Sequence, residues 1–151
     1  MKRILMVCLG NICRSPLAEG ILKSKVDPNE ITVDSAATSN YHIGSTPDPR
    51  SISTAILHNI DISDQRGRQF QVSDFDHFDK IYVMDNSNYR NVKALARDRK
   101  DIEKIDLILN TIFPGQDRDV PDPYYGGEDG FEKVYKMLDE ACSNIASELS
   151  Y

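Results

Sequence analysis

Residues 3–22 read RILMVCLGNICRSPLAEGIL, and they carry the clearest structural pattern of the chain. An apolar run at residues 4–7 ends at Cys8, and Arg14 follows six residues later. Beyond Arg14, apolar residues recur through residues 17–26 at the spacing of one helix face. The pattern predicts a buried strand, a tight loop and an amphipathic helix, in that order.

The predicted loop is suited to binding an anion. Gly10 and Asn11 tolerate a positive φ, so the backbone can curl and point successive N–H groups inward. Ser15 is a good N-cap and Pro16 fits the first helical turn, so we expect the helix to begin there with the positive end of its dipole facing the loop. The curled amides and the helix end together predict an anion-binding cradle.

Cys8 and Arg14 bring reactive groups to this cradle. A thiol near N–H donors, a helix N-terminus and a guanidinium ionises readily, because each of these favours the thiolate. The planar guanidinium of Arg14 matches two oxygens of a phosphate. We therefore predict that Cys8 is a nucleophile at the bottom of an oxyanion site. The predicted phosphate-binding residues are Leu9, Gly10, Asn11, Ile12, Cys13, Arg14 and Ser15.

The order of Cys8, five residues, Arg14 and Ser15 is the signature of cysteine-dependent phosphatases. The fuller string CLGNICRSP closely resembles the low-molecular-weight protein tyrosine phosphatases, and the resemblance extends over nearly the full chain. It implies hydrolysis of protein phosphotyrosine through a phospho-cysteine intermediate at Cys8, with no metal and no organic cofactor. The plainer alternative is a buried cysteine at a strand end beside a surface arginine.

The composition is typical of an ordinary soluble domain. The chain has 151 residues, of which 40% are hydrophobic and 28% charged, and we expect a single domain over residues 1–151. The net charge of −6 does not favour a nucleic-acid partner, and no apolar stretch is long enough to cross a membrane. Three cysteines predict no disulfide scaffold, and a nucleophile that must stay reduced favours the cytoplasm.

Strand and helix patterns alternate along the rest of the chain, which predicts an α/β fold with three layers, α/β/α, and a parallel sheet covered by helices on both faces. Further strands are predicted at 31–36, 80–84 and 105–109, and further helices at 52–60, 88–97 and 131–149. Periodicity alone does not separate a strand from an apolar turn at 105–109, and its length and β-branching favour the strand. Residues 38–49 are expected to form a surface loop and residues 74–79 a turn-like connector.

The resemblance adds that the sheet is twisted and has four strands, with a phosphate-binding loop after the first. Ligands of parallel sheets bind beyond the C-terminal ends of the strands, and Cys8 lies at such an end.

The leaving group of a phosphate ester needs a proton, and residues 120–126, VPDPYYG, hold the predicted donor. Asp122 lies between Pro121 and Pro123, which stiffen a loop that could lean over the cradle. The string DPYY closely resembles the family's general-acid loop. This implies that Asp122 is the acid and, once ionised, the base that activates water. An ordinary acidic turn is the alternative, because Asp-Pro pairs are common in loops.

Aromatic residues are expected to set the size of the substrate. In the family, the loop positions of Tyr41 and Tyr124 wall a slot for a flat phenyl ring, and Ile12 and Tyr125 complete the predicted pocket. A deep slot admits phosphotyrosine more easily than the shorter phosphoserine. Taken singly, an exposed tyrosine such as Tyr41 is often a packing residue, and Tyr125 could equally be a core residue or a regulatory phosphorylation site.

Polar side chains are expected to hold the shape of the phosphate-binding loop through hydrogen bonds. Ser15 can donate its hydroxyl to the Cys8 thiolate, and Asn11 and Ser35 resemble a pair that holds the loop's shape in the family. The family often has a histidine at about Gln65, and Gln65 can still bond to Asn11 although it cannot titrate.

The other cysteines carry two further expectations. The resemblance implies that Cys13 forms a reversible disulfide with Cys8 under oxidation, and a small buried thiol is an equal alternative. Cys142 is expected in the core, and the three histidines show no metal-ligand spacing.

Two related activities use a similar cradle. Thioredoxin-coupled arsenate reductases need a further cysteine pair in the middle of the chain, and no cysteine lies between Cys13 and Cys142. Protein arginine phosphatases have a threonine where this chain has Ile12. We therefore expect phosphotyrosine proteins or peptides as substrates, inorganic phosphate and similar oxyanions as inhibitors, and a monomer with no membrane partner. The physiological substrate stays open.

Overall fold

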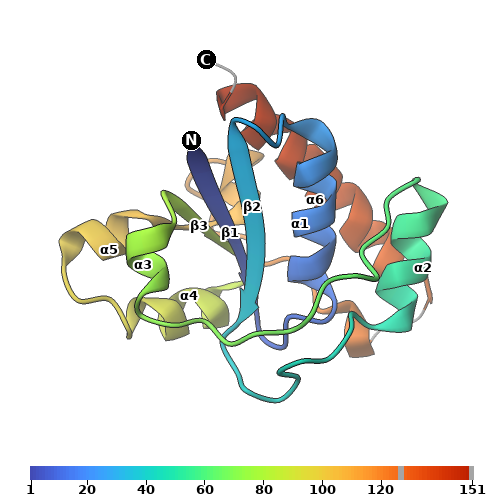
Figure 1. The fold of residues 1–151 in the computed structure, drawn as a ribbon, viewed down its shortest axis with the longest axis horizontal. Helices are drawn as coiled ribbons and strands as arrows, with labels where there is room; N and C mark the ends of the chain where they lie inside the picture. The colour runs from blue at the N-terminus through green and yellow to red at the C-terminus, as the bar shows by residue number, and fades with distance from the viewer. Residues whose placement is uncertain (126–127, 150–151) are drawn as a thin grey trace.

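A four-stranded parallel sheet forms the centre of the molecule (Figure 1), and its strands run in the order β2-β1-β3-β4. The computed structural model describes residues 1–125 and 128–149. The strands are β1 (Lys2–Cys8), β2 (Ile31–Ala37), β3 (Lys80–Val83) and β4 (Ile105–Leu107). Each strand returns to the next through at least one helix, so the predicted four-stranded parallel sheet is confirmed.

Helices cover both faces of this sheet, which confirms the predicted three layers (Figure 1). One face carries α1 (Arg14–Lys25), α2 (Pro49–Leu57) and α6 (Glu128–Leu149), and the other carries α3 (Asp74–His77), α4 (Asn86–Lys93) and α5 (Arg99–Glu103). Two short 3₁₀ helices, η1 (Ile108–Thr111) and η2 (Pro123–Tyr125), lie between β4 and α6. Within residues 1–125 and 128–149, no helix combines the length and the apolar character that a membrane span needs.

The apolar side chains of β1 divide between two cores, because successive side chains of a strand point to opposite faces. Ile4 and Met6 are buried in the core that includes α1 and α6, whereas Leu5 and Val7 are buried with β3 and α4. A strand buried on both faces has a continuous apolar run, which is why residues 4–7 show no alternation. Each such side chain contributes about 1.5–3 kcal/mol on burial.

The C-terminal ends of β1 and its neighbours meet at one edge of the sheet. Cys8 pairs with Ala37 of β2, and Val7 pairs with Val83 of β3. The chain leaves β1 toward α1 on one face and leaves β3 toward α4 on the other. This divergence opens the crevice in which doubly wound sheets bind ligands.

The prediction that Ser15 caps α1 was wrong. The helix begins at Arg14, Cys13 takes the N-cap position, and no side chain makes a capping bond there. Ser15 is the second residue of the helix, and its hydroxyl faces the loop that precedes the helix.

Two further helix predictions were wrong in their limits. The helix expected at 88–97 ends at Lys93, and the chain forms α5 shortly afterwards because Asp98 accepts a capping bond from Asp101 N–H. Leu95, expected on the apolar side, is therefore 44% exposed. The second helix ends at Leu57, and Ile56 points to solvent although its spacing predicted burial.

The remaining segments follow the predictions with smaller differences. Residues 74–77 form a helical turn, α3, inside the expected connector, and the strand expected at 105–109 ends at Leu107 because the chain turns into η1. The last helix begins at Glu128, and most of its predicted apolar stripe is buried: Phe131, Val134, Leu138, Ala141 and Ile145, with Leu149 partly buried.

Candidate active site

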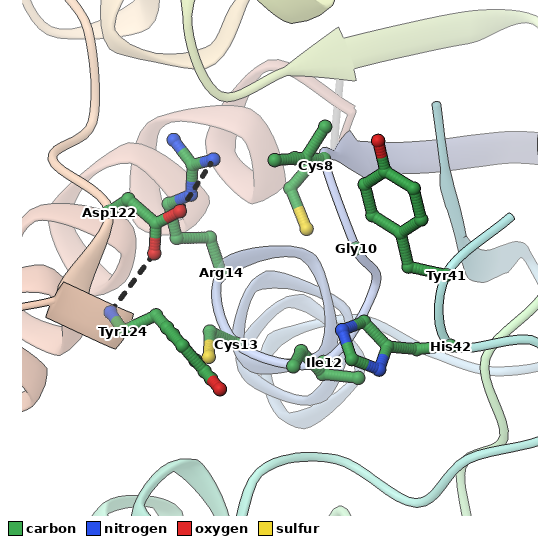
Figure 2. Close-up of a pocket in the computed structure, with 10 residues that line it drawn as sticks. Cys8, Gly10, Ile12, Cys13, Arg14, Tyr41, His42, Asp122 and Tyr124 are labelled. Atoms are coloured by element: carbon green, nitrogen blue, oxygen red, sulfur yellow. Dashed lines mark hydrogen bonds and ion pairs between the residues drawn. The ribbon is translucent and has the colours of Figure 1, made fainter. Parts of the chain in front are cut away.

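The loop between β1 and α1 curls around the sulfur of Cys8 (Figure 2). The N–H of Asn11 donates to Cys8 Sγ at 3.2 Å, and Ser15 Oγ lies 3.0 Å from the same sulfur. Asn11 has a φ of 57°, so it supplies the left-handed turn that the sequence predicted. Gly10 serves a different purpose, because a Cβ at this position would lie 3.0 Å from the ring of His42.

A buried hydrogen-bond network holds this loop in place. The amide of Asn11 donates to Ser15 Oγ at 2.8 Å and to Ser35 Oγ at 2.9 Å, and Ser35 in turn donates to Glu19 Oε1 at 2.6 Å. Because Ser15 Oγ accepts from Asn11, the Ser15 proton is free to point at Cys8 Sγ. The carbonyl of the Asn11 side chain accepts from Arg68 N–H at 3.2 Å.

Two residues in or near this network were not as predicted from the sequence. Gln65 does not bond to Asn11, because the Asn11 carbonyl is taken by Arg68 and Gln65 Nε2 donates to Pro16 O at 3.1 Å. Glu19 was missed, although it is 4% exposed. Burial raises the pKa of Glu19, while hydrogen bonds from Lys23 and Ser35 act in the opposite direction.

Arg14, the first residue of α1, lines the pocket and is 2% exposed. Its Nη1 donates to Asp85 Oδ2 at 2.8 Å and to Val120 O at 2.9 Å. Burial disfavours the charge of Arg14, but Cys8, Asp85 and Asp122 outweigh this and raise its pKa above the ordinary value. Arg14 therefore stays a cation with its position set by two separate loops.

Asp85 was missed as a site residue. It follows the C-terminal end of β3, which lies beside β1, and it also caps α4 by accepting from Asn88 N–H at 2.8 Å. The rule that parallel sheets bind ligands beyond these ends could have identified it.

Asp122 approaches from the segment that precedes η2 (Figure 2). One carboxylate oxygen accepts from Tyr124 N–H at 3.0 Å, and the other lies 3.8 Å from Arg14 Nη2. The Asp122 side chain is 32% exposed and is thus partly open to solvent. Its carboxyl group faces the same cavity as the sulfur of Cys8.

A pocket of about 170 Å³ joins these groups. Tyr41 and Tyr124 stand on opposite sides of it, and both are exposed (Figure 2). His42, which was not predicted from the sequence as a site residue, lies beside Tyr41 and also lines the pocket. The pocket is lined by Cys8, Leu9, Gly10, Ile12, Cys13, Arg14, Tyr41, His42, Asp122 and Tyr124. Asn11, Ser15 and Ser35 are buried and are not among the described residues that line the pocket, and the side chain of Tyr125 is outside the described residues.

The other two cysteines are buried thiols. Burial, followed by the charges of Asp48 and Cys8, raises the pKa of Cys13 to about 12, so the Cys13 thiol stays protonated beside Cys8. Burial likewise raises the pKa of Cys142 to about 12, and its thiol faces Ala18 O at 3.7 Å in the core. The reversible disulfide between Cys8 and Cys13 stays a prediction.

Comparison with known proteins gives one consistent result. The model of the family described as low molecular weight phosphotyrosine protein phosphatase matches residues 3–151. The low molecular weight phosphotyrosine protein phosphatase of Homo sapiens is 40% identical, over 93% of this chain and 91% of the human one. A protein tyrosine phosphatase crystal structure from Entamoeba histolytica, with Hepes in its active site, superposes with a TM-score of 0.91 at 36% identity and covers 99% of this chain and 97% of its own. Vibrio vulnificus Wzb in complex with benzylphosphonate superposes with a TM-score of 0.87 at 28% identity, covering 97% and 98%.

Proposed function

The chain belongs to the low molecular weight phosphotyrosine protein phosphatase family, and from this premise we propose that Cys8 is the nucleophile and Asp122 the general acid and base of its phosphatase reaction. Its relatives and structural neighbours are hydrolases of this family, and a cysteine-based mechanism is typical of them. The observation that carries the assignment is that Cys8 and Asp122 line one pocket, with Arg14 contacting Asp122.

In the first step the phosphoryl group of the substrate occupies the cradle, where backbone N–H groups and Arg14 stabilise its oxygens. The thiolate of Cys8 attacks phosphorus and forms the S–P bond while the bond from phosphorus to the phenolic oxygen breaks. The protonated carboxyl of Asp122 gives its proton to that oxygen, so that a neutral phenol leaves.

In the second step water hydrolyses the phospho-cysteine. The carboxylate of Asp122 removes a proton from water, the water oxygen attacks phosphorus, and the S–P bond breaks. Inorganic phosphate leaves, Cys8 is again a thiolate and Asp122 is again protonated. The hydroxyl of Ser15 at 3.0 Å and the N–H of Asn11 at 3.2 Å favour the thiolate in both steps.

The walls of the pocket support phosphotyrosine as the substrate. Tyr41 and Tyr124 offer two aromatic faces to a flat ring, and Ile12 adds an apolar contact. The benzylphosphonate bound to Vibrio vulnificus Wzb is an aromatic oxyanion of this kind. We therefore assign phosphotyrosine proteins or peptides as substrates and inorganic phosphate and related oxyanions as inhibitors. Since Cys8 must stay reduced, the cytosol is the compartment that suits this chemistry.

The test compares Cys8→Ser and Asp122→Ala with Asp64→Ala, which removes an exposed carboxylate outside the pocket. On a phosphotyrosine peptide we expect no measurable hydrolysis by Cys8→Ser and a kcat/KM about 10²–10⁴-fold lower for Asp122→Ala, with the Asp64→Ala variant unchanged. Turnover at the normal rate by either of the first two variants would remove that residue from its proposed role.

A further inference from the structure

Arg50 joins the phosphate-binding loop to the segment that carries Asp122. Its Nη1 donates to Tyr124 O at 3.3 Å, and its guanidinium carbon lies 5.2 Å from the centre of the Tyr124 ring and 4.7 Å from that of Phe131. Phe131 is a buried residue of α6, so the guanidinium packs against one fixed ring and one ring of the pocket wall. Arg50 itself does not line the pocket.

Asp48 fixes the other side of Arg50. Its two carboxylate oxygens accept from Arg50 Nε at 3.0 Å and from Arg50 Nη2 at 2.9 Å, which is the bidentate geometry that gives an ion pair a defined orientation. The Asp48 side chain is 9% exposed. The hydrogen bonds from Arg50 hold the pKa of Asp48 below its usual range, so the carboxylate stays charged at neutral pH.

The start of α2 is in turn attached to the phosphate-binding loop. Asp48 N–H donates to Ile12 O at 2.8 Å, and Ser51 Oγ donates to Cys13 O at 3.4 Å. Contacts therefore run without a gap from the cradle through Asp48 and Arg50 to the carbonyl of Tyr124.

The peptide of Tyr124 completes this chain of contacts. Its carbonyl accepts from Arg50, and its N–H donates to Asp122 Oδ1 at 3.0 Å. Tyr124 thus both lines the pocket and holds one oxygen of the Asp122 carboxyl group through its N–H. A general acid contributes fully only when it lies within hydrogen-bond reach of the atom that receives its proton. The position of the Asp122 carboxyl group therefore affects the rate at which the leaving group is protonated.

We propose that Arg50, oriented by Asp48, is a positioning residue that sets the place of Asp122 relative to the phosphate-binding loop. The inference rests on the proposed function, because it gives Arg50 an effect only through the acid. Loss of Arg50 then weakens proton donation to the leaving group more than it weakens attack by Cys8.

The test compares two substrates with the same ring and different leaving groups. The phenolate released from phenyl phosphate is about as basic as that of tyrosine, since its phenol has a pKa near 10, so its departure depends on a proton from the acid. The nitrophenolate released from p-nitrophenyl phosphate is a far weaker base and needs that proton less. The quantity measured is kcat/KM, which covers the transfer of phosphoryl to Cys8. For Arg50→Ala we expect kcat/KM to fall about tenfold on phenyl phosphate and no more than about twofold on p-nitrophenyl phosphate.

Two further variants sharpen the test. Arg50→Lys keeps the charge but lacks the fork that reaches Asp48 and Tyr124 together, so its loss should lie between those of the wild type and Arg50→Ala. Arg99→Ala removes an arginine that is 91% exposed and pairs with Glu103, and it should leave both values unchanged. Thermal melting of each variant confirms that the compared proteins are folded.

The outcomes separate the inference from the proposed function. An equal fall on both substrates, or no fall on either, overturns the positioning role of Arg50. Asp122→Ala in the same assay tests the acid itself: if it shows the dependence on leaving group and Arg50→Ala does not, the function stands and this inference fails. If Asp122→Ala also lacks that dependence, the proposed acid is wrong.

Discussion

Replacing Asn11 by glycine or by alanine tests how far one side chain holds the phosphate-binding loop. The side chain donates to Ser15 and Ser35 and accepts from Arg68 N–H, and the residue is 3% exposed. Each of these bonds has a net value of about 1 kcal/mol, so we expect Asn11→Gly to lower the free energy of unfolding by about 3 kcal/mol.

Asn11→Ala is expected to cost more than Asn11→Gly. The φ of 57° at this position is accessible to glycine without strain, whereas alanine pays roughly 1–2 kcal/mol for it. The free energy of unfolding should therefore fall by roughly 4 kcal/mol in the alanine variant. Both variants should also lose about tenfold in kcat/KM, because the Ser15 hydroxyl loses the donor that directs its proton to Cys8.

Urea unfolding followed by circular dichroism measures the stability of both variants, with the exposed Asn29→Ala as the control expected within about 0.5 kcal/mol of the wild type. A loss below about 1 kcal/mol in Asn11→Gly would refute the hydrogen-bond reasoning. Equal losses in the two Asn11 variants would refute the contribution assigned to backbone conformation.

Two other predictions concern buried thiol and carboxyl groups whose pKa is raised. Burial and nearby negative charges raise the pKa of Cys13 to about 12, and burial raises that of Cys142 to about 12, so iodoacetamide at neutral pH should modify Cys8 first. Peptide mass spectrometry measures the order of modification, and Cys13 modified ahead of Cys8 would contradict this prediction. Burial also raises the pKa of Glu19 above its ordinary 4.5. Above that pH the folded chain holds this proton more firmly than the unfolded chain, so stability falls as the pH rises, and Glu19→Gln should remove this part of the slope. Urea midpoints measured for both proteins from about pH 4 to pH 7 check this, and parallel curves would contradict it.

The parts of the site that the sequence predicted are local in the chain. The apolar run before Cys8, the turn-forming Asn11 and the spacing to Arg14 all lie within one strand–loop–helix segment, so their geometry follows from neighbouring residues. For Asp122, the prolines on both sides predict a stiff loop, and its proposed role as the acid came from the resemblance of the string DPYY to the family's general-acid loop.

The predicted helix limits were wrong where a hydrogen-bond partner distant in the sequence, or the N-cap of a following helix, overrode the local helix preference. Ser15 has the properties of an N-cap, but its hydroxyl bonds to Cys8 and Asn11, and the N-cap of the helix is Cys13, two residues earlier. Leu95 has helical spacing, but Asp98 starts a new helix after it and leaves it exposed.

The strand, the loop and the helix around Cys8 were predictable from residues 3–22 alone, because short-range periodicity and turn chemistry specify these elements. Which residues surround these elements depends on contacts between segments that are distant in the sequence. Asp85 meets Arg14 across 71 positions of sequence and Arg50 meets Tyr124 across 74. Such contacts exist because the strand order and the packing of helices on the sheet bring distant segments together, and no local pattern encodes that proximity.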